Sequence, residues 1–97
     1  MLKHFDKAFE NRLRLQIMAV LTANENYDFN SLKDLLEVTD GNLASHIKAL
    51  EKAGYIGVNK AFVGRKTRTS YCATPAGRQA FEKHLSTLEE LIRQQRS

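Results

Sequence analysis

The sequence predicts a mainly α-helical domain that carries a small antiparallel β-hairpin and ends in a long helix. Apolar residues recur at three- and four-residue steps over about residues 4–22, 31–37, 41–53 and 75–95, which is the spacing of one helix face. Between residues 55 and 74 apolar and polar residues alternate instead, as they do along a strand. Gly64 divides that alternating stretch in two, where a hairpin would turn.

Length and composition limit the class of protein. The 97 residues correspond to one domain, residues 1–97, and 42% of them are hydrophobic, which is enough for a folded core. The single cysteine excludes an internal disulfide framework and favours a reducing compartment. The charged N-terminal segment does not resemble a signal peptide, and no apolar run approaches the roughly 20 residues of a membrane span. We therefore expect a cytoplasmic protein with no membrane partner.

The first predicted helix spans about residues 4–22 and ends before the turn-forming segment "TANENYD". Residues 27–29 are expected to form a very short strand. The apolar stripe of this helix consists of Phe5, Phe9, Leu13, Ile17, Val20 and Leu21.

Two short helices follow within residues 30–54. Asn30 or Ser31 is expected to cap the first helix, and Ser31 with Asp34 resembles a capping box. Its buried side is expected to consist of Leu32, Leu35 and Leu36. Thr39 or Asp40 is expected to cap the second helix, which stops at Gly54. Two short helices joined by a tight turn are typical of a helix-turn-helix.

The second short helix has the face of a recognition helix. At about 100° per residue, Leu43, Ile47 and Leu50 fall in one narrow sector, which is the core side. The side away from the core is small and polar at its centre and basic toward its C-terminal end, and it contains Asn42, Ser45, His46, Lys48, Ala49 and Lys52. In a major groove, Asn42, Ser45 and His46 would read bases, and Lys48 and Lys52 would contact phosphates.

Free backbone N–H groups at helix N-termini also hold phosphate oxygens. Asn30, Ser31 and Thr39 lie at the two N-termini of the helix-turn-helix, so we include them as candidate DNA contacts. Simple capping is the alternative role for each.

Positive charge gathers in residues 48–68, which hold six lysines and arginines against Glu51 alone. The predicted hairpin of residues 55–74 places Arg65, Lys66, Thr67 and Arg68 at or beside its tip. Helix, helix-turn-helix, hairpin and final helix together form a winged helix-turn-helix: a three-helix core, a two- to three-stranded wing and a long C-terminal helix. In that arrangement the tip reaches the DNA backbone or the minor groove, where arginine is favoured electrostatically.

The final helix, residues 75–95, begins with Thr74 as its N-cap and Pro75 at its first position. Phe81, Leu85, Leu88 and Ile92 form an apolar stripe on it. We expect this stripe, together with Phe5 and Phe9, to pack across the two-fold axis of a homodimer. The alternative is that both stripes close one monomeric core.

The segment "TDGNLASHIKALEKAGYI", followed by the basic hairpin and "TPAGRQAF", resembles winged helix transcriptional regulators of the MarR, ArsR and PadR kind. The likeness covers about residues 10–82 and is closest to the short, stand-alone MarR-like regulators. The resemblance implies sequence-specific DNA binding as a homodimer, usually as a repressor. It also implies that Asn42, Ser45 and His46 face DNA and that residues 65–68 form the wing.

We expect neither enzymatic activity nor a cofactor. The sequence has no phosphate-binding glycine loop, nucleophile elbow or zinc-protease motif. Cys72, His4, His46 and His84 are scattered without metal-ligand spacing, and Cys72 is expected to be a structural thiol. The expected partners are double-stranded DNA with a pseudo-palindromic site and a second copy of the chain; the sequence identifies no small-molecule effector. The alternative function is a winged helix used for protein–protein contact in a larger assembly.

Overall fold

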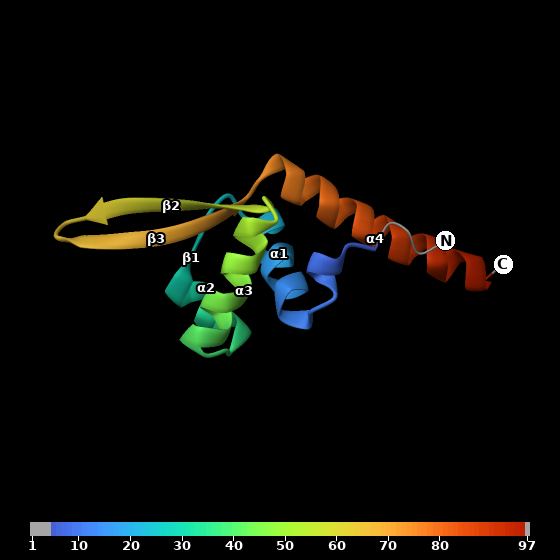
Figure 1. The fold of residues 1–97 in the computed structure, drawn as a ribbon, viewed down its shortest axis with the longest axis horizontal. Coiled ribbons are helices and arrows are strands. Elements are labelled where there is room, and N and C mark those ends of the chain that lie inside the picture. The colour runs from blue at the N-terminus through green and yellow to red at the C-terminus, as the bar shows by residue number, and fades with distance from the viewer. Residues whose placement is uncertain (1–4, 97) are drawn as a thin grey trace.

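The computed structural model describes residues 5–96, and within them four α-helices pack against a three-stranded sheet. Helix α1 (Arg12–Ala23) lies at the centre, with α2 (Phe29–Leu36) and α3 (Asp40–Lys52) packed beside it. The long helix α4 (Pro75–Arg96) extends to one side and the hairpin to the other, so the molecule is elongated (Figure 1). The predicted fold class is therefore confirmed.

The sheet is antiparallel and has the strand order β1-β3-β2. Strand β1 (Tyr27–Asp28) pairs with the inner half of β3 (Lys66–Ala73), and β2 (Ile56–Val63) pairs with all of it. Ile56, Tyr71 and Ala73 are buried against the helices, whereas residues 58–68 of the hairpin are exposed. The outer half of the hairpin is thus a wing that projects from the domain.

The first helix begins later than predicted. A short 3₁₀ helix, η1 (Lys7–Phe9), precedes it, and the predicted start at residue 4 lies outside the described residues. Asn11 is extended, and its side chain accepts a hydrogen bond from the backbone N–H of Arg14 at 3.1 Å. This N-cap starts a new helix at Arg12 and interrupts what the apolar spacing presents as one continuous stripe.

The first helix of the helix-turn-helix begins at Phe29, because Asp28 and not Asn30 or Ser31 is its N-cap. The Asp28 carboxylate accepts hydrogen bonds from the Ser31 hydroxyl at 2.7 Å and from the Ser31 backbone N–H at 3.1 Å. Leu32 is buried as predicted, but Leu35 is 54% exposed. At α3, Thr39 caps the helix as predicted by accepting from the Asn42 N–H at 3.2 Å.

Gly54 and Tyr55 form a junction that joins α3, the base of the wing and α4. Gly54 has a φ of 81°, a backbone conformation that glycine adopts without strain, and it ends α3. The Thr74 hydroxyl donates to the Gly54 carbonyl at 2.7 Å, and the Thr74 N–H donates to the Tyr55 carbonyl at 3.0 Å. The same hydroxyl accepts from the Gly77 N–H at 2.9 Å, which confirms Thr74 as the cap of α4.

The N-terminal segment and α4 also attach to this region. The Tyr55 hydroxyl donates to the Asp6 carboxylate, and this hydrogen bond raises the pKa of Tyr55 to about 12. Phe9 packs against Tyr55 and Phe81, with ring centroids 5.5 and 5.9 Å away. One guanidinium nitrogen of Arg78 donates to the Thr22 carbonyl at 2.9 Å, which ties α4 to the end of α1.

Replacing Gly77 by alanine should destabilise the domain by about 3 kcal/mol, because the first turn of α4 lies directly on the Tyr55 backbone. A Cβ at position 77 would lie 2.0 Å from the Tyr55 carbonyl oxygen, so α4 would have to move. Gly41→Ala is the matched control, since a Cβ there meets no atom within 4 Å, and its effect should stay within about 1 kcal/mol. Urea unfolding measures both, and equal stabilities for the two variants would contradict the packing described.

Protonation of Asp28 should contribute to the loss of folding stability in acid. Hydrogen bonds from the Ser31 hydroxyl and backbone, with the nearby charge of Arg68, lower the Asp28 pKa from its ordinary 3.8. The folded state therefore binds this proton more weakly than the unfolded state, and the stabilisation is present above the ordinary pKa and lost as pH falls through the lowered one. Between about pH 7 and about pH 3, wild type should lose more stability than Asp28→Asn, whose amide still caps α2. Equal losses in urea unfolding would show that Asp28 contributes nothing.

Candidate nucleic-acid interface

The exposed face of α3 contains the side chains that the sequence predicts for base reading. Leu43, Ile47 and Leu50 are buried against α1, and the opposite side of the helix is open. Of the predicted set, Asn42, Ser45, Lys48 and Lys52 are exposed, while His46 and Ala49 are half-buried. Gly41 and Ala44, which were not predicted, are also exposed. The N-terminal half of this face therefore carries only small side chains beside the polar Asn42 and Ser45. A helix face of this shape fits a major groove about 12 Å wide.

His46 is held in place by Arg14, a residue that is not among the predicted site residues. The Nε of Arg14, on α1, donates a hydrogen bond to the Nδ1 of His46 at 3.0 Å. Because a guanidinium only donates, Nδ1 is the unprotonated nitrogen and the neutral ring has its proton on Nε2. His46 can therefore offer one N–H donor, which suits the acceptor N7 and O6 atoms of purines in the major groove.

The start of α2 is a poorer phosphate site than predicted. The Ser31 N–H and hydroxyl both bond to the Asp28 carboxylate, so the group that would receive a phosphate already has an anionic partner. Asn30 is exposed beside it. At the start of α3, the Thr39 hydroxyl serves as the cap, and Thr39 itself is exposed.

Strand pairing sorts the wing residues onto two faces. Gly64 (φ 67°) and Arg65 form the turn, and Val63 pairs with Lys66, Ala61 with Arg68 and Phe62 with Thr67. Cross-strand partners share a face, and successive residues alternate. Lys66 and Arg68 therefore lie side by side on one face, Phe62, Lys60 and Thr67 lie on the other, and Arg65 is at the end.

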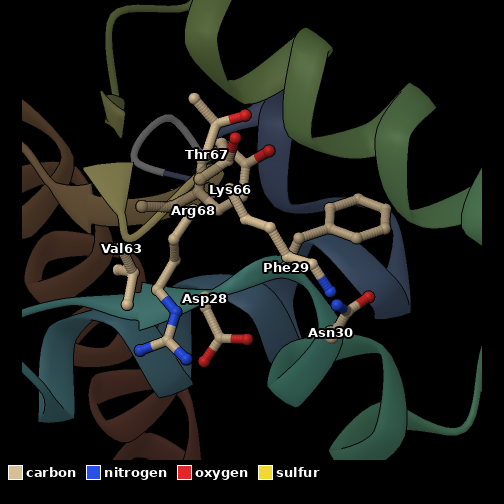
Figure 2. Close-up of a pocket in the computed structure, with 9 residues that line it drawn as sticks. Asp28, Phe29, Asn30, Val63, Lys66, Thr67 and Arg68 are labelled. Atoms are coloured by element: carbon tan, nitrogen blue, oxygen red, sulfur yellow. The ribbon is translucent and has the colours of Figure 1, made fainter. Parts of the chain in front are cut away.

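A surface hollow of about 450 Å³ lies between the wing and the start of α2. Figure 2 shows the Arg68 side chain beside Asp28, and Lys66 extending toward Asn30. Phe29 and Tyr71 form part of its wall, with ring centroids 6.5 Å apart. The fold thus brings together two groups that are distant in the sequence, the cations of the wing and the N-terminus of α2. Asp28 places one negative charge among them, next to Arg68.

The residues predicted for a dimer interface differ in how far they are buried. Phe9 and Phe81 are 3% and 7% exposed and belong to the chain's own core, which corrects the expectation that they pack across a dimer axis. Phe5 is half-buried, with its ring centroid 5.2 Å from that of His84. Leu85, Leu88 and Ile92 are exposed on the outer part of α4.

The described residues contain no group suited to metal chemistry. Among residues 5–96, no three His, Cys, Asp or Glu side chains lie close enough together to hold a metal ion. Cys72 is half-buried, with its sulfur 3.9 Å from the Gly57 carbonyl. No helix in this part of the chain is long and apolar enough to cross a membrane.

Similarity to known proteins agrees with this fold. The family model described as "Winged helix DNA-binding domain" matches residues 13–92. An uncharacterized protein of Methanocaldococcus jannaschii is 35% identical over 85 residues, which are 88% of this chain and 92% of that protein. The structure of a transcriptional regulator homologue from Pyrococcus horikoshii OT3 superposes with a TM-score of 0.82 at 33% identity, over 88% of this chain and 84% of the other.

A more distant neighbour was solved with DNA bound. Bacillus subtilis PadR, in complex with operator DNA, superposes with a TM-score of 0.69 at 17% identity, over 77% of this chain and 47% of that one. At that identity the likeness shows a shared fold. The chain belongs to the winged helix DNA-binding domain family, and its structural neighbours are transcriptional regulators of the MarR and PadR kind.

Proposed function

We propose that this chain is a sequence-specific transcriptional regulator, which binds double-stranded DNA as a homodimer and acts as a repressor. The observation that carries the proposal is the position of residues 52–81, a segment that contains no Asp or Glu. Together with Lys48, this segment supplies exposed cations to the α3 face and to the wing, namely Lys52, Lys60, Arg65, Lys66 and Arg68. Phosphate contacts of this kind provide affinity, whereas contacts to base edges provide specificity.

The α3 face supplies the base-reading part of the proposal. Asn42 can pair bidentately with adenine, Ser45 bonds to several base edges, and His46 offers its Nε2–H. Lys48 and Lys52 lie farther along the helix, where phosphates of the groove wall would be. Among the helix N-termini, exposed Thr39 and Asn30 remain candidate backbone contacts, and Ser31 is the weakest because Asp28 holds it.

The dimer part of the proposal rests on α4. Leu85, Leu88 and Ile92 follow one another at three- and four-residue steps and are exposed, so they form one apolar stripe. In Figure 1 this part of α4 lies at the opposite end of the molecule from the wing. Pairing two such stripes about a two-fold axis would leave both α3 faces and both wings free. Two recognition helices would then meet successive major grooves about 34–36 Å apart.

Lys66→Ala should weaken binding to every duplex and lower the slope of log affinity against log salt by about one unit, because one phosphate contact is lost. Lys83→Ala is the matched control, since Lys83 is an exposed lysine on α4, away from the proposed interface. Fluorescence anisotropy at several salt concentrations measures the slope. Equal slopes for wild type and Lys66→Ala would remove the wing from the interface.

Asn42→Ala should act on specificity. We expect a loss of about 1–3 kcal/mol at one base position of the bound site, with little change in the salt slope. Competition between duplexes that differ at single positions measures this loss. A uniform loss across all sequences would assign Asn42 to the DNA backbone.

Leu88→Asp should convert the dimer to a monomer, because it places a charge in the proposed apolar contact. Ser86→Asp, an equal charge change on an exposed residue off the stripe, should leave the dimer intact. Sedimentation at micromolar concentration distinguishes the two states, and circular dichroism checks that both variants are folded. A wild-type chain that sediments as a monomer would contradict the dimer.

A further inference from the structure

The wing ends in an apolar tip that no described part of the chain covers. Phe62 is 81% exposed and Val63 is 58% exposed, at the end of β2 next to the turn. On the face of the hairpin that contains Phe62, the last buried position is Tyr71, which pairs with Val58. Phe62 is four residues farther out, about 13 Å along the strand. Figure 1 shows the outer wing standing clear of the helices, so the fold of one chain offers Phe62 no place to pack.

Positive charge surrounds this apolar tip. Arg65 is in the turn, and Lys66 and Arg68 lie beside Val63 on the face of the hairpin opposite to Phe62. No Asp or Glu occurs between Lys52 and Phe81. An exposed phenylalanine with three cations within a few residues suits a partner that is negatively charged outside and apolar inside. A DNA duplex has this character, because its phosphates enclose stacked bases.

We propose that Phe62 is an apolar wedge that enters the minor groove of the bound duplex and opens a base step. This inference rests on the proposed DNA-binding function and assigns a role to the tip that phosphate contacts alone do not require. The strands of a hairpin lie about 4.8 Å apart, so a wing with its side chains is too broad for a minor groove about 6 Å wide. One ring can enter, and inserted apolar side chains unstack a step and bend the duplex toward the major groove.

The wedge has a consequence for specificity. Pyrimidine–purine steps such as TA and CA unstack most easily, so the deformation energy depends on the sequence at the wing position. Arg65, Lys66 and Arg68 would hold the phosphates around the opened step and fix its distance from the bases under α3. The chain would thus select a flexible step at a position where it makes no polar base contact.

A second copy of the chain is a weaker candidate for covering the tip. The exposed stripe of Leu85, Leu88 and Ile92 lies on α4, at the opposite end of the molecule (Figure 1). Contact between copies through that stripe leaves both tips in solvent. No acidic residue in the wing would offset the repulsion between two tips of like charge.

The test uses the duplex that the wild-type chain selects from a random pool, labelled at its ends with a donor and an acceptor dye to report bending. Phe62→Ala should bind about tenfold more weakly and bend the duplex less, because an apolar contact is lost. Its salt slope should equal that of wild type, since no phosphate contact changes. Phe62→Leu keeps an apolar wedge and should retain most of the bend.

Two controls separate this inference from the proposed function. Leu35→Ala removes another exposed apolar side chain, from α2, and should change neither affinity nor bending, while Lys66→Ala should lower the salt slope. Wild-type affinity and bending in Phe62→Ala, with a lowered slope in Lys66→Ala, would overturn the wedge and leave DNA binding in place. Selection of no duplex by the wild-type chain would overturn both. Binding to phosphatidylserine vesicles that Phe62→Ala abolishes, with unchanged duplex affinity, would assign the tip to a lipid surface.

Discussion

The junction at Gly54 and Tyr55 is the constraint on which the rest of the structure depends. Between Lys52 and Ile56 the chain ends α3, starts the hairpin and receives the first turn of α4. Thr74 ties these parts together, because its hydroxyl bonds both to the Gly54 carbonyl and to the Gly77 N–H. Gly77 allows α4 to lie on the Tyr55 backbone, where any side chain would collide. The hydrogen bonds and close packing at this junction therefore help to set how α3, the wing and α4 are arranged.

This junction links the two candidate DNA-contacting surfaces. The α3 face and the wing each carry cations, and the junction at Gly54 and Tyr55 connects them. Arg14 fixes the ring of His46 on α3, and Asp28 places a carboxylate beside Arg68 at the base of the wing's basic face. In the proposed complex, α3 would read the major groove while the wing deforms the minor groove beside it.

Much of this fold is predictable because its determinants are local. Thr39 and Thr74 act as caps through bonds within three residues, and Gly54 and Gly64 stand where the backbone requires a positive φ. Local rules fail where two candidates compete. Asp28 displaces Ser31 as the cap of α2, and Asn11 starts a new helix inside one apolar stripe.

Long-range contacts account for what the sequence did not reveal. Arg14 and His46 are 32 positions apart, and nothing in the local pattern of either residue signals their hydrogen bond. The stripe of α4 is apolar along its length, yet Phe81 is in the core and Ile92 is in solvent. Periodicity identifies an apolar face but not what covers it. Phe62 continues the alternation of a buried strand, and only the length of the wing places it beyond the core.

Selection of bound sequences from a random duplex pool tests the central claim most directly, because it examines DNA binding, specificity and symmetry in one measurement. The account predicts an enriched pseudo-palindrome with half-site centres about one helical turn apart, or a multiple of it, since a two-fold dimer reads the same bases twice. Recovery of a pool as random as the starting one would contradict sequence-specific binding. Enrichment of a single asymmetric half-site would contradict the homodimer.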